Sequence, residues 1–121
     1  MRIGAINGLL GVYAMTLWEF ASEVLLGFPR PLDWTVNEAI VGSIPAAFAM
    51  HFGVGAVGGI VFEWLLPAHL SHRRVPLALA YAAALQSALL VIAPLLVEVS
   101  SAAIVGSIIG HGVYGLVISR R

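Results

Sequence analysis

Two histidines of this chain stand in the same local pattern, His51-Phe-Gly-Val-Gly55 and His111-Gly-Val-Tyr-Gly115. In each pattern a glycine follows the histidine four residues later, so the imidazole and the glycine share one face of a helix. Both patterns fall inside long apolar segments, where an ionisable side chain is costly and marks a functional site by default. Imidazoles on two helices can relay protons, ligate haem iron or form hydrogen bonds between helices. The two histidines are therefore the first candidates for chemistry.

Two other polar side chains lie at a similar depth in other apolar segments. Gln86 is near the middle of the third segment, and Glu19 is in the outer half of the first. With a helical rise of about 1.5 Å per residue, these two residues and the two histidines fall within about two turns of a common level. The sequence therefore predicts a polar layer across the protein, made by Glu19, His51, Gln86 and His111.

Several kinds of chemistry have no basis in the sequence. The chain has no Glu-x-x-His motif for a di-iron site, no phosphate-binding loop and no metalloprotease motif. It also has no cysteine, which excludes thiolate ligands, disulfides and covalently attached haem. We therefore predict that the protein is not an enzyme and holds no metal ion. The one cofactor that the residues allow is haem b, with His51 and His111 as its two axial ligands.

The composition places these residues in a lipid bilayer. Of the 121 residues, 60% are hydrophobic and only 10% are charged, whereas soluble domains are about 45–50% apolar and about 25% charged. The net charge of zero gives no electrostatic footprint for nucleic acid. Four apolar stretches are long enough to cross a bilayer as helices, at about residues 3–27, 39–66, 76–97 and 101–119. We predict an all-α integral membrane protein, a single domain of four transmembrane helices in an up-down bundle.

The arginines predict how this bundle is oriented. In the predicted topology, a single arginine, Arg30, lies in the connection over residues 28–37, beside Asp33 and close to Glu38. Because arginine is enriched in cytoplasmic loops, we expect both termini to be cytoplasmic and the protein to lie in the inner or plasma membrane of the cell. The arginines expected on the cytoplasmic side are Arg2, Arg73, Arg74, Arg120 and Arg121.

Glycines at helical spacing predict how the four helices pack. In a bilayer, close contact between small residues replaces much of the hydrophobic driving force between helices. Such contacts are expected on the first, second and fourth spans, at Gly4, Gly8, Gly53, Gly55, Gly59, Gly106, Gly110 and Gly115.

Three short motifs together resemble a known group of proteins. They are Ala14-Met15-Thr16, His51 with Gly55 and Gly59, and His111 with Tyr114-Gly115. The set is similar to that of small four-helix inner-membrane proteins of bacteria and archaea, in which an Ala-Met-Thr segment precedes helices that carry His-x-x-aromatic-Gly. The chain departs from that pattern at Val54, where an aromatic residue is usual, and at Ser119, where the next glycine would fall. The resemblance implies the four-helix fold and carries no activity with it.

Size, short loops and abundant small-residue faces favour a non-catalytic accessory or scaffold subunit of a larger membrane complex. Its expected partners are the lipid bilayer and other membrane subunits, or further copies of itself in a homo-oligomer. An alternative is an oligomeric transporter or channel for protons or small ions that uses the intramembrane Glu and His layer. A second alternative is a haem b subunit with two histidine ligands.

Overall fold

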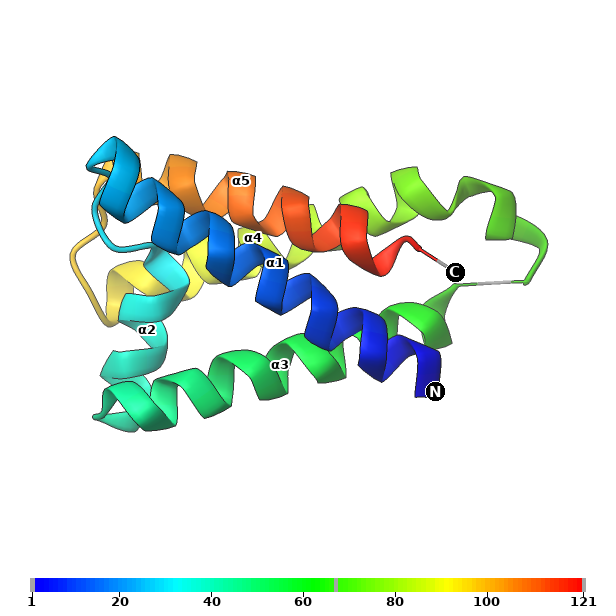
Figure 1. Ribbon diagram of the computed structural model, residues 1–121, viewed down its shortest axis with the longest axis horizontal. Helices are drawn as coiled ribbons and strands as arrows, with labels where there is room; N and C mark the ends of the chain where they lie inside the picture. Colours follow the sequence, from blue (N-terminus) through cyan, green and yellow to red (C-terminus); the bar gives the residue numbers. More distant parts are fainter. Residues whose placement is uncertain (1, 67, 121) are drawn as a thin grey trace.

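The computed structural model describes residues 2–66 and 68–120, which are helical with no strand among them. The elements are α1 (Arg2–Leu26), α2 (Leu32–Val41), α3 (Ile44–Leu65), η1 (Ala68–Arg73), α4 (Arg74–Ile92), η2 (Ala93–Leu95) and α5 (Ser101–Ile118), where η denotes a 3-10 helix. In this described part, four helical segments are long and apolar enough to cross a membrane. In Figure 1, α1, α3, α4 and α5 run along the long axis in alternating directions, and α2 lies across one end. The predicted all-α class with four spanning helices is confirmed.

The start of the second span differs from the prediction. The sequence analysis expects a connection over residues 28–37 and a helix over residues 39–66, but Leu32–Val41 forms the separate helix α2 and the span begins at Ile44. Gly42 ends α2 because it adopts a left-handed conformation, with a φ of 73°. The Ser43 hydroxyl then accepts a hydrogen bond from the Ala46 N–H and starts α3. The predicted range 39–66 thus includes the last residues of α2, and the span itself is α3.

The other three spans lie close to their predicted positions. α1 and α5 end within one residue of the expected bounds of 3–27 and 101–119. The span expected over 76–97 begins slightly earlier as α4, at Arg74, and its regular helix stops at Ile92. Pro94 lies in the 3-10 turn η2 that follows, because proline lacks the N–H that would continue the α-helix.

α1 and α3 cross at glycines on both helices. A methyl group added at Gly59 would lie 2.2 Å from the Gly4 carbonyl oxygen, and one added at Gly8 would lie 2.3 Å from the Gly55 carbonyl oxygen. These are contacts with backbone atoms, which no side-chain movement can relieve. The two helices therefore approach as closely as they do only because all four positions lack a side chain.

Glycines also allow close packing against α5, whereas Gly53 of α3 makes no such contact. Gly115 accommodates Ala82 of α4, Gly110 accommodates Met15 of α1, and Gly106 lies 3.6 Å from Phe28 (distance from an added methyl group). Gly53 behaves differently, because nothing described lies within 4 Å of a methyl group placed there. The expectation that Gly53 packs inside the bundle is thus not met, and this glycine faces outward.

α2 fills the space that opens between α1 and α3 away from their crossing. In Figure 1 the two helices lie far apart at the end where α2 bridges them. Leu32 and Val36 of α2 are buried against Ala93 of η2 in a small apolar cluster. Burial of two aliphatic side chains stabilises the packing by about 3–6 kcal/mol at most. This cluster fixes which face of α2 points into the protein.

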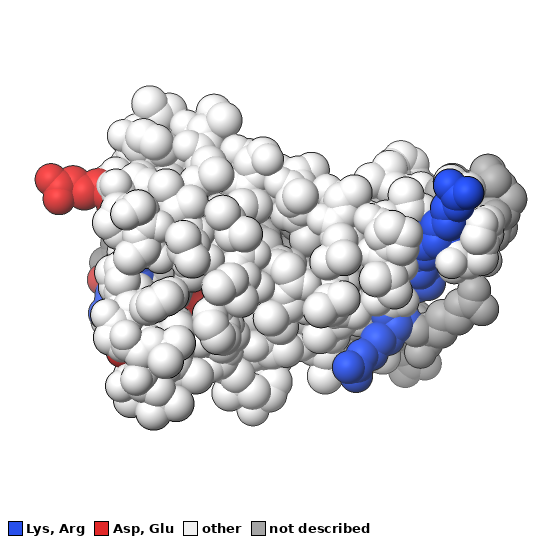
Figure 2. Space-filling model, turned by 90° about the horizontal axis from the view of Figure 1, so that it is seen from above, with Lys and Arg blue, Asp and Glu red and all other residues white. Residues whose placement is uncertain are grey.

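Charged residues are segregated between the two ends of the bundle. Figure 2 shows arginines at the end where the termini lie, and acidic side chains at the opposite end. We call these the arginine end and the α2 end. At the arginine end, Arg74 donates to both carboxylate oxygens of Glu63 and to the carbonyl oxygen of Ser119, 2.9 Å away. Of the predicted cytoplasmic arginines, Arg121 and the side chain of Arg2 lie outside the described residues. The orientation in the membrane stays a prediction.

A labelling experiment measures that orientation. The chain has no cysteine, so single cysteines can be introduced on a clean background at exposed Glu98 and exposed Arg73. In intact cells we expect a membrane-impermeant maleimide to label Glu98→Cys, and to label Arg73→Cys only after lysis. The reverse pattern would show that the arginine end faces outward.

The crossing of α1 and α3 predicts unequal effects of alanine on one helix. Gly59→Ala introduces a methyl group against the α1 backbone, so we expect the free energy of unfolding in detergent to fall by about 1–3 kcal/mol. Gly53→Ala is the matched control on the same helix, because no described atom lies within 4 Å of its methyl group. Denaturant titration followed by circular dichroism measures both. Equal losses at the two positions would contradict the close crossing.

Candidate functional site

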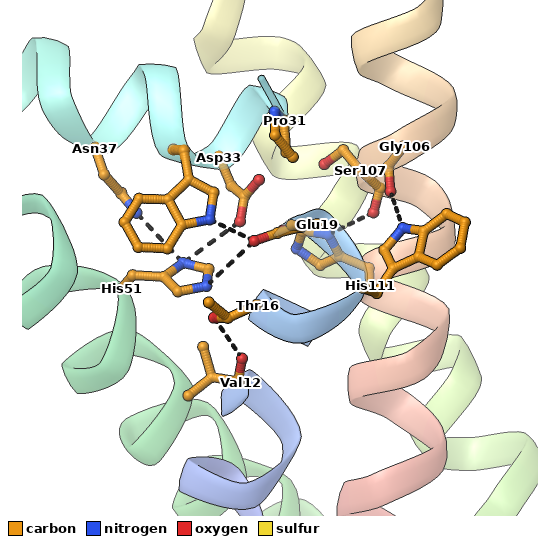
Figure 3. A network of polar contacts seen from close by, with 12 residues as sticks. Val12, Thr16, Glu19, Pro31, Asp33, Asn37, His51, Gly106, Ser107 and His111 are labelled. Carbon is orange, nitrogen blue, oxygen red and sulfur yellow. Dashed lines mark hydrogen bonds and ion pairs between the residues drawn. The ribbon is translucent and has the colours of Figure 1, made fainter. Parts of the chain in front are cut away.

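Three ionisable side chains from three different helices meet inside the protein near the α2 end. They are Glu19 of α1, Asp33 of α2 and His51 of α3, and each offers one ligand atom within 4.8 Å of the others. The His51 Nδ1 atom lies 3.4 Å from Asp33 Oδ2, and His51 Nε2 lies 3.9 Å from Glu19 Oε2. Figure 3 shows the three side chains pointing toward one another from their separate helices. We call this group the carboxyl–imidazole cluster.

Local sequence explains how each helix presents its member. Asp33 and Asn37 are four residues apart on α2, so they share one face, next to the face on which Leu32 and Val36 are buried. Asn37 Nδ2 lies 3.5 Å from His51 Nδ1. On α1, Gly110 of the neighbouring helix leaves room for the Glu19 carboxylate, because a methyl group there would lie 3.4 Å from Glu19 Oε1.

The cluster is buried and incompletely hydrogen-bonded. Glu19, Asp33 and His51 are 2%, 7% and 5% exposed. Among the described residues, no hydrogen-bond partner is found for Glu19 Oε1, for either oxygen of Asp33 or for His51 Nε2. A buried polar atom without a partner costs about 1–3 kcal/mol, and more when it is charged. A cluster of this kind destabilises the fold, so stability alone does not account for it.

Trp34 encloses the cluster on one side. Its indole N–H donates to Glu19 Oε2. Its ring lies over the His51 ring with centroids 4.7 Å apart, and Phe48 packs against its edge at 4.4 Å. The tryptophan therefore orients both Glu19 and His51 and separates them from the apolar surroundings.

Two cavities lie on opposite sides of the cluster. The first, which we call the α1–α3 cavity, has a volume of about 230 Å³ and is lined by Glu19, Trp34 and the exposed residues Glu23 and Arg30. The second, the central cavity, has a volume of about 260 Å³ and is lined by residues of all five α-helices, among them Asp33, Asn37, His51 and His111. Glu19 faces the first cavity and His51 faces the second. The cluster therefore borders both cavities.

The structure brings together part of the predicted polar layer. Glu19 and His51 meet in the cluster, whereas Gln86 and His111 form a second polar group on α4 and α5. There Ser107 Oγ donates to Gln86 Oε1 over 2.9 Å, and the Ser107 carbonyl oxygen lies 3.0 Å from His111 Nδ1. His111 shares the central cavity with His51 without belonging to the cluster. The two His-x-x-x-Gly patterns are linked by Tyr114, which belongs to the second pattern. Its hydroxyl donates to the Gly55 carbonyl oxygen of the first pattern over 2.8 Å.

Sequence analysis missed Asp33, which it assigned to a connection outside the membrane. The signal that was available is the pattern Pro31-Leu-Asp-x-x-Val-Asn37, in which apolar and polar residues recur four apart directly after a proline. Proline is common at helix starts, and this spacing is typical of an amphipathic helix. The pattern predicts a short helix with one apolar and one polar face, but it does not indicate that the polar face turns inward.

No family model, no curated protein and no solved structure matches this chain. The function is therefore argued from the site itself. In the cluster both nitrogens of His51 lie close to carboxyl groups, so the geometry adds no support to the haem alternative.

The missing hydrogen bonds predict that the cluster can be weakened without loss of stability. Asp33→Asn keeps the shape of the side chain and removes a buried carboxylate whose two oxygens have no hydrogen-bond partner among the described residues, so we expect the free energy of unfolding to rise by about 1–2 kcal/mol. Glu98→Gln, a neutralisation of an exposed carboxylate at the same end, is the control and should change it little. A fall of about 1 kcal/mol or more in Asp33→Asn, measured in detergent at neutral pH, would show that the cluster is structural.

Proposed function

We propose that the protein transports protons or small cations across a cell membrane, with the carboxyl–imidazole cluster as the binding site. The observation that carries the proposal is the position of Glu19, Asp33 and His51 between two cavities, buried and with unpartnered atoms. Ionisable groups within membrane-spanning helices are rare and mark ion pathways and proton relays. The lipid bilayer is the expected surrounding of the four apolar helices.

The α2 end supplies a route to the cluster. The α1–α3 cavity contains Glu19 together with three charged residues near the surface, Glu23, Arg30 and Glu38. Arg30 and Glu38 form an exposed ion pair of 2.8 Å, and the interaction of such a pair is worth about 1 kcal/mol or less. A cation that enters from this end thus meets a weakly held surface pair and then the buried Glu19 carboxylate.

Contacts between helices hold the described part of the arginine end together. α1 and α3 are in backbone contact at their glycines, and Arg74 joins Glu63 of α3 to the carbonyl oxygens at the end of α5. In the proposed transport cycle, this conformation would be the one that admits a cation from the α2 end. Opening toward the arginine end would separate Glu63 from Arg74, since that pair is the polar link there between α3 and α4.

The accessory-subunit role stays a second candidate, favoured by one observation. Ala49 and Gly53 are both exposed and lie four residues apart on α3, so they present a small-residue face outside the bundle. A helix of another subunit or of a second copy would pack there. The other predicted packing glycines lie against residues of this same chain.

Reconstituted vesicles test transport directly. Proteoliposomes that contain the purified protein and a trapped pH indicator receive a potassium diffusion potential, and a parallel set with a trapped metal indicator receives a Mn²⁺ gradient. We expect protein-dependent flux in at least one set. Glu19→Gln should lower it at least tenfold, because the neutral amide neither attracts a cation nor carries a proton.

The control for this experiment is Glu98→Gln, which removes an exposed carboxylate at the α2 end outside the cavities. It should leave the flux unchanged. Absence of flux in both vesicle sets, or equal flux in Glu19→Gln and the unmodified protein, would refute the transport proposal.

A further inference from the structure

We propose that Glu19, Asp33 and His51 bind a divalent transition-metal ion. The inference deepens the proposed function, because it names the cation, but binding itself is measured without transport. It also departs from the sequence-based expectation that the protein holds no metal.

The distances in the cluster are close to those of a metal site. Two ligands bound to Zn²⁺ at about 2.0–2.1 Å in tetrahedral geometry are about 3.3–3.4 Å apart. His51 Nδ1 and Asp33 Oδ2 are already 3.4 Å apart. One ligand atom from each of the three residues lies within 4.8 Å of the other two, so side-chain movements of up to about 1.5 Å would bring the three atoms to the spacing of a three-ligand set. Three protein ligands leave a fourth position open for water or an exchanging ligand.

A second observation, independent of the clustering, points to a ligand. Glu19 Oε1, both Asp33 oxygens and His51 Nε2 have no hydrogen-bond partner among the described residues. The side chains of Glu19, Asp33 and His51, which carry these atoms, are more than nine-tenths buried. Taken without the backbone, they are 2%, 9% and 6% exposed. Figure 3 shows them aimed at one another. Coordination of a cation would satisfy several of these atoms at once. Arg30 does not take that role, because it is paired with Glu38.

The donor atoms indicate which class of ion fits. One imidazole nitrogen and two carboxylates suit Zn²⁺, Mn²⁺ or Fe²⁺. Ca²⁺ prefers six to eight oxygen ligands, and Mg²⁺ keeps most of its waters in octahedral geometry. Neither fits a buried site with three protein ligands and a nitrogen donor. The site therefore favours first-row transition metals over Ca²⁺ and Mg²⁺.

The charge of the site matches that of a divalent ion. Two carboxylates and a neutral imidazole carry a charge of −2, which a divalent ion cancels. Metal ligands are bound in deprotonated form, so binding of the ion is expected to release protons.

Other charged groups around the cluster do not change this charge balance. Glu23, Arg30 and Glu38 line the α1–α3 cavity toward the surface, and Arg30 and Glu38 neutralise each other as an ion pair. His111 and Tyr114 of α5 line the central cavity, and the Tyr114 hydroxyl donates a hydrogen bond to the Gly55 carbonyl oxygen. The cluster is thus the set of groups whose charge balances that of the ion.

Metal titration of the purified protein tests the inference. The protein, prepared without a polyhistidine tag and with exposed His72 changed to alanine to remove an accessible imidazole, is titrated in detergent with Zn²⁺ and with Mn²⁺. Calorimetry gives the stoichiometry, and a pH indicator in weak buffer gives the protons released. We expect one ion per chain, release of protons on binding, and no saturable binding of Ca²⁺ at the same concentrations.

Three substitutions distinguish the cluster from its surroundings. Asp33→Asn and His51→Ala should each weaken binding at least tenfold. His111→Ala is the matched control, because His111 lines the same cavity outside the cluster, and it should bind as the unmodified protein does. Helical circular dichroism confirms that each variant is folded.

The outcomes separate this inference from the proposed function. Failure of the folded protein to bind either metal, or equal binding in Asp33→Asn and His111→Ala, would overturn the metal site, and proton flux in vesicles would still support transport. Saturable binding that Asp33→Asn and His51→Ala weaken would support the site, and absence of flux in that case would refute transport alone.

Discussion

The crossing of α1 and α3 at four glycines is the contact on which the rest of the structure depends. Because Gly8 and Gly59 have no side chain, the two backbones touch near the arginine end, and the helices lie far apart near the other end (Figure 1). That separation creates the space that α2 fills. Asp33 and Asn37 enter the protein with α2 and lie beside His51. The polar site is thus a geometrical consequence of close packing elsewhere.

Two ion-paired groups in the same chain differ in how well their atoms are satisfied. At the arginine end, Arg74 uses its guanidinium to bind Glu63 and the carbonyl oxygens at the end of α5, as expected of a structural pair. In the carboxyl–imidazole cluster, four nitrogen or oxygen atoms have no hydrogen-bond partner. Atoms without a hydrogen-bond partner cost stability, which supports the proposal that the cluster serves a function. This contrast is the main physical reason for proposing a binding site at the cluster.

Much of the fold could be predicted because it depends on local properties of the chain. Long apolar segments define the spans, and spaced glycines define faces that allow close approach. Glu19 and His51 stood out because ionisable groups are rare in such segments. Gln86 and His111 stood out for the same reason, yet they bind to Ser107 instead. Depth along a helix was readable from the sequence, whereas the direction in which each side chain points around the bundle was not.

The sequence by itself determined that the protein is an all-helical bundle with four apolar helices, and which polar residues lie at depth within them. Only the tertiary structure decided that residues 32–41 form a helix that turns inward, that Gly53 faces outward, and that Asp33 completes the site. The physical reason is that hydropathy and helical periodicity are set by neighbours in the chain, whereas the cluster is set by the angle between two helices. That angle arises from contacts between residues some fifty positions apart, such as Gly8 and Gly55.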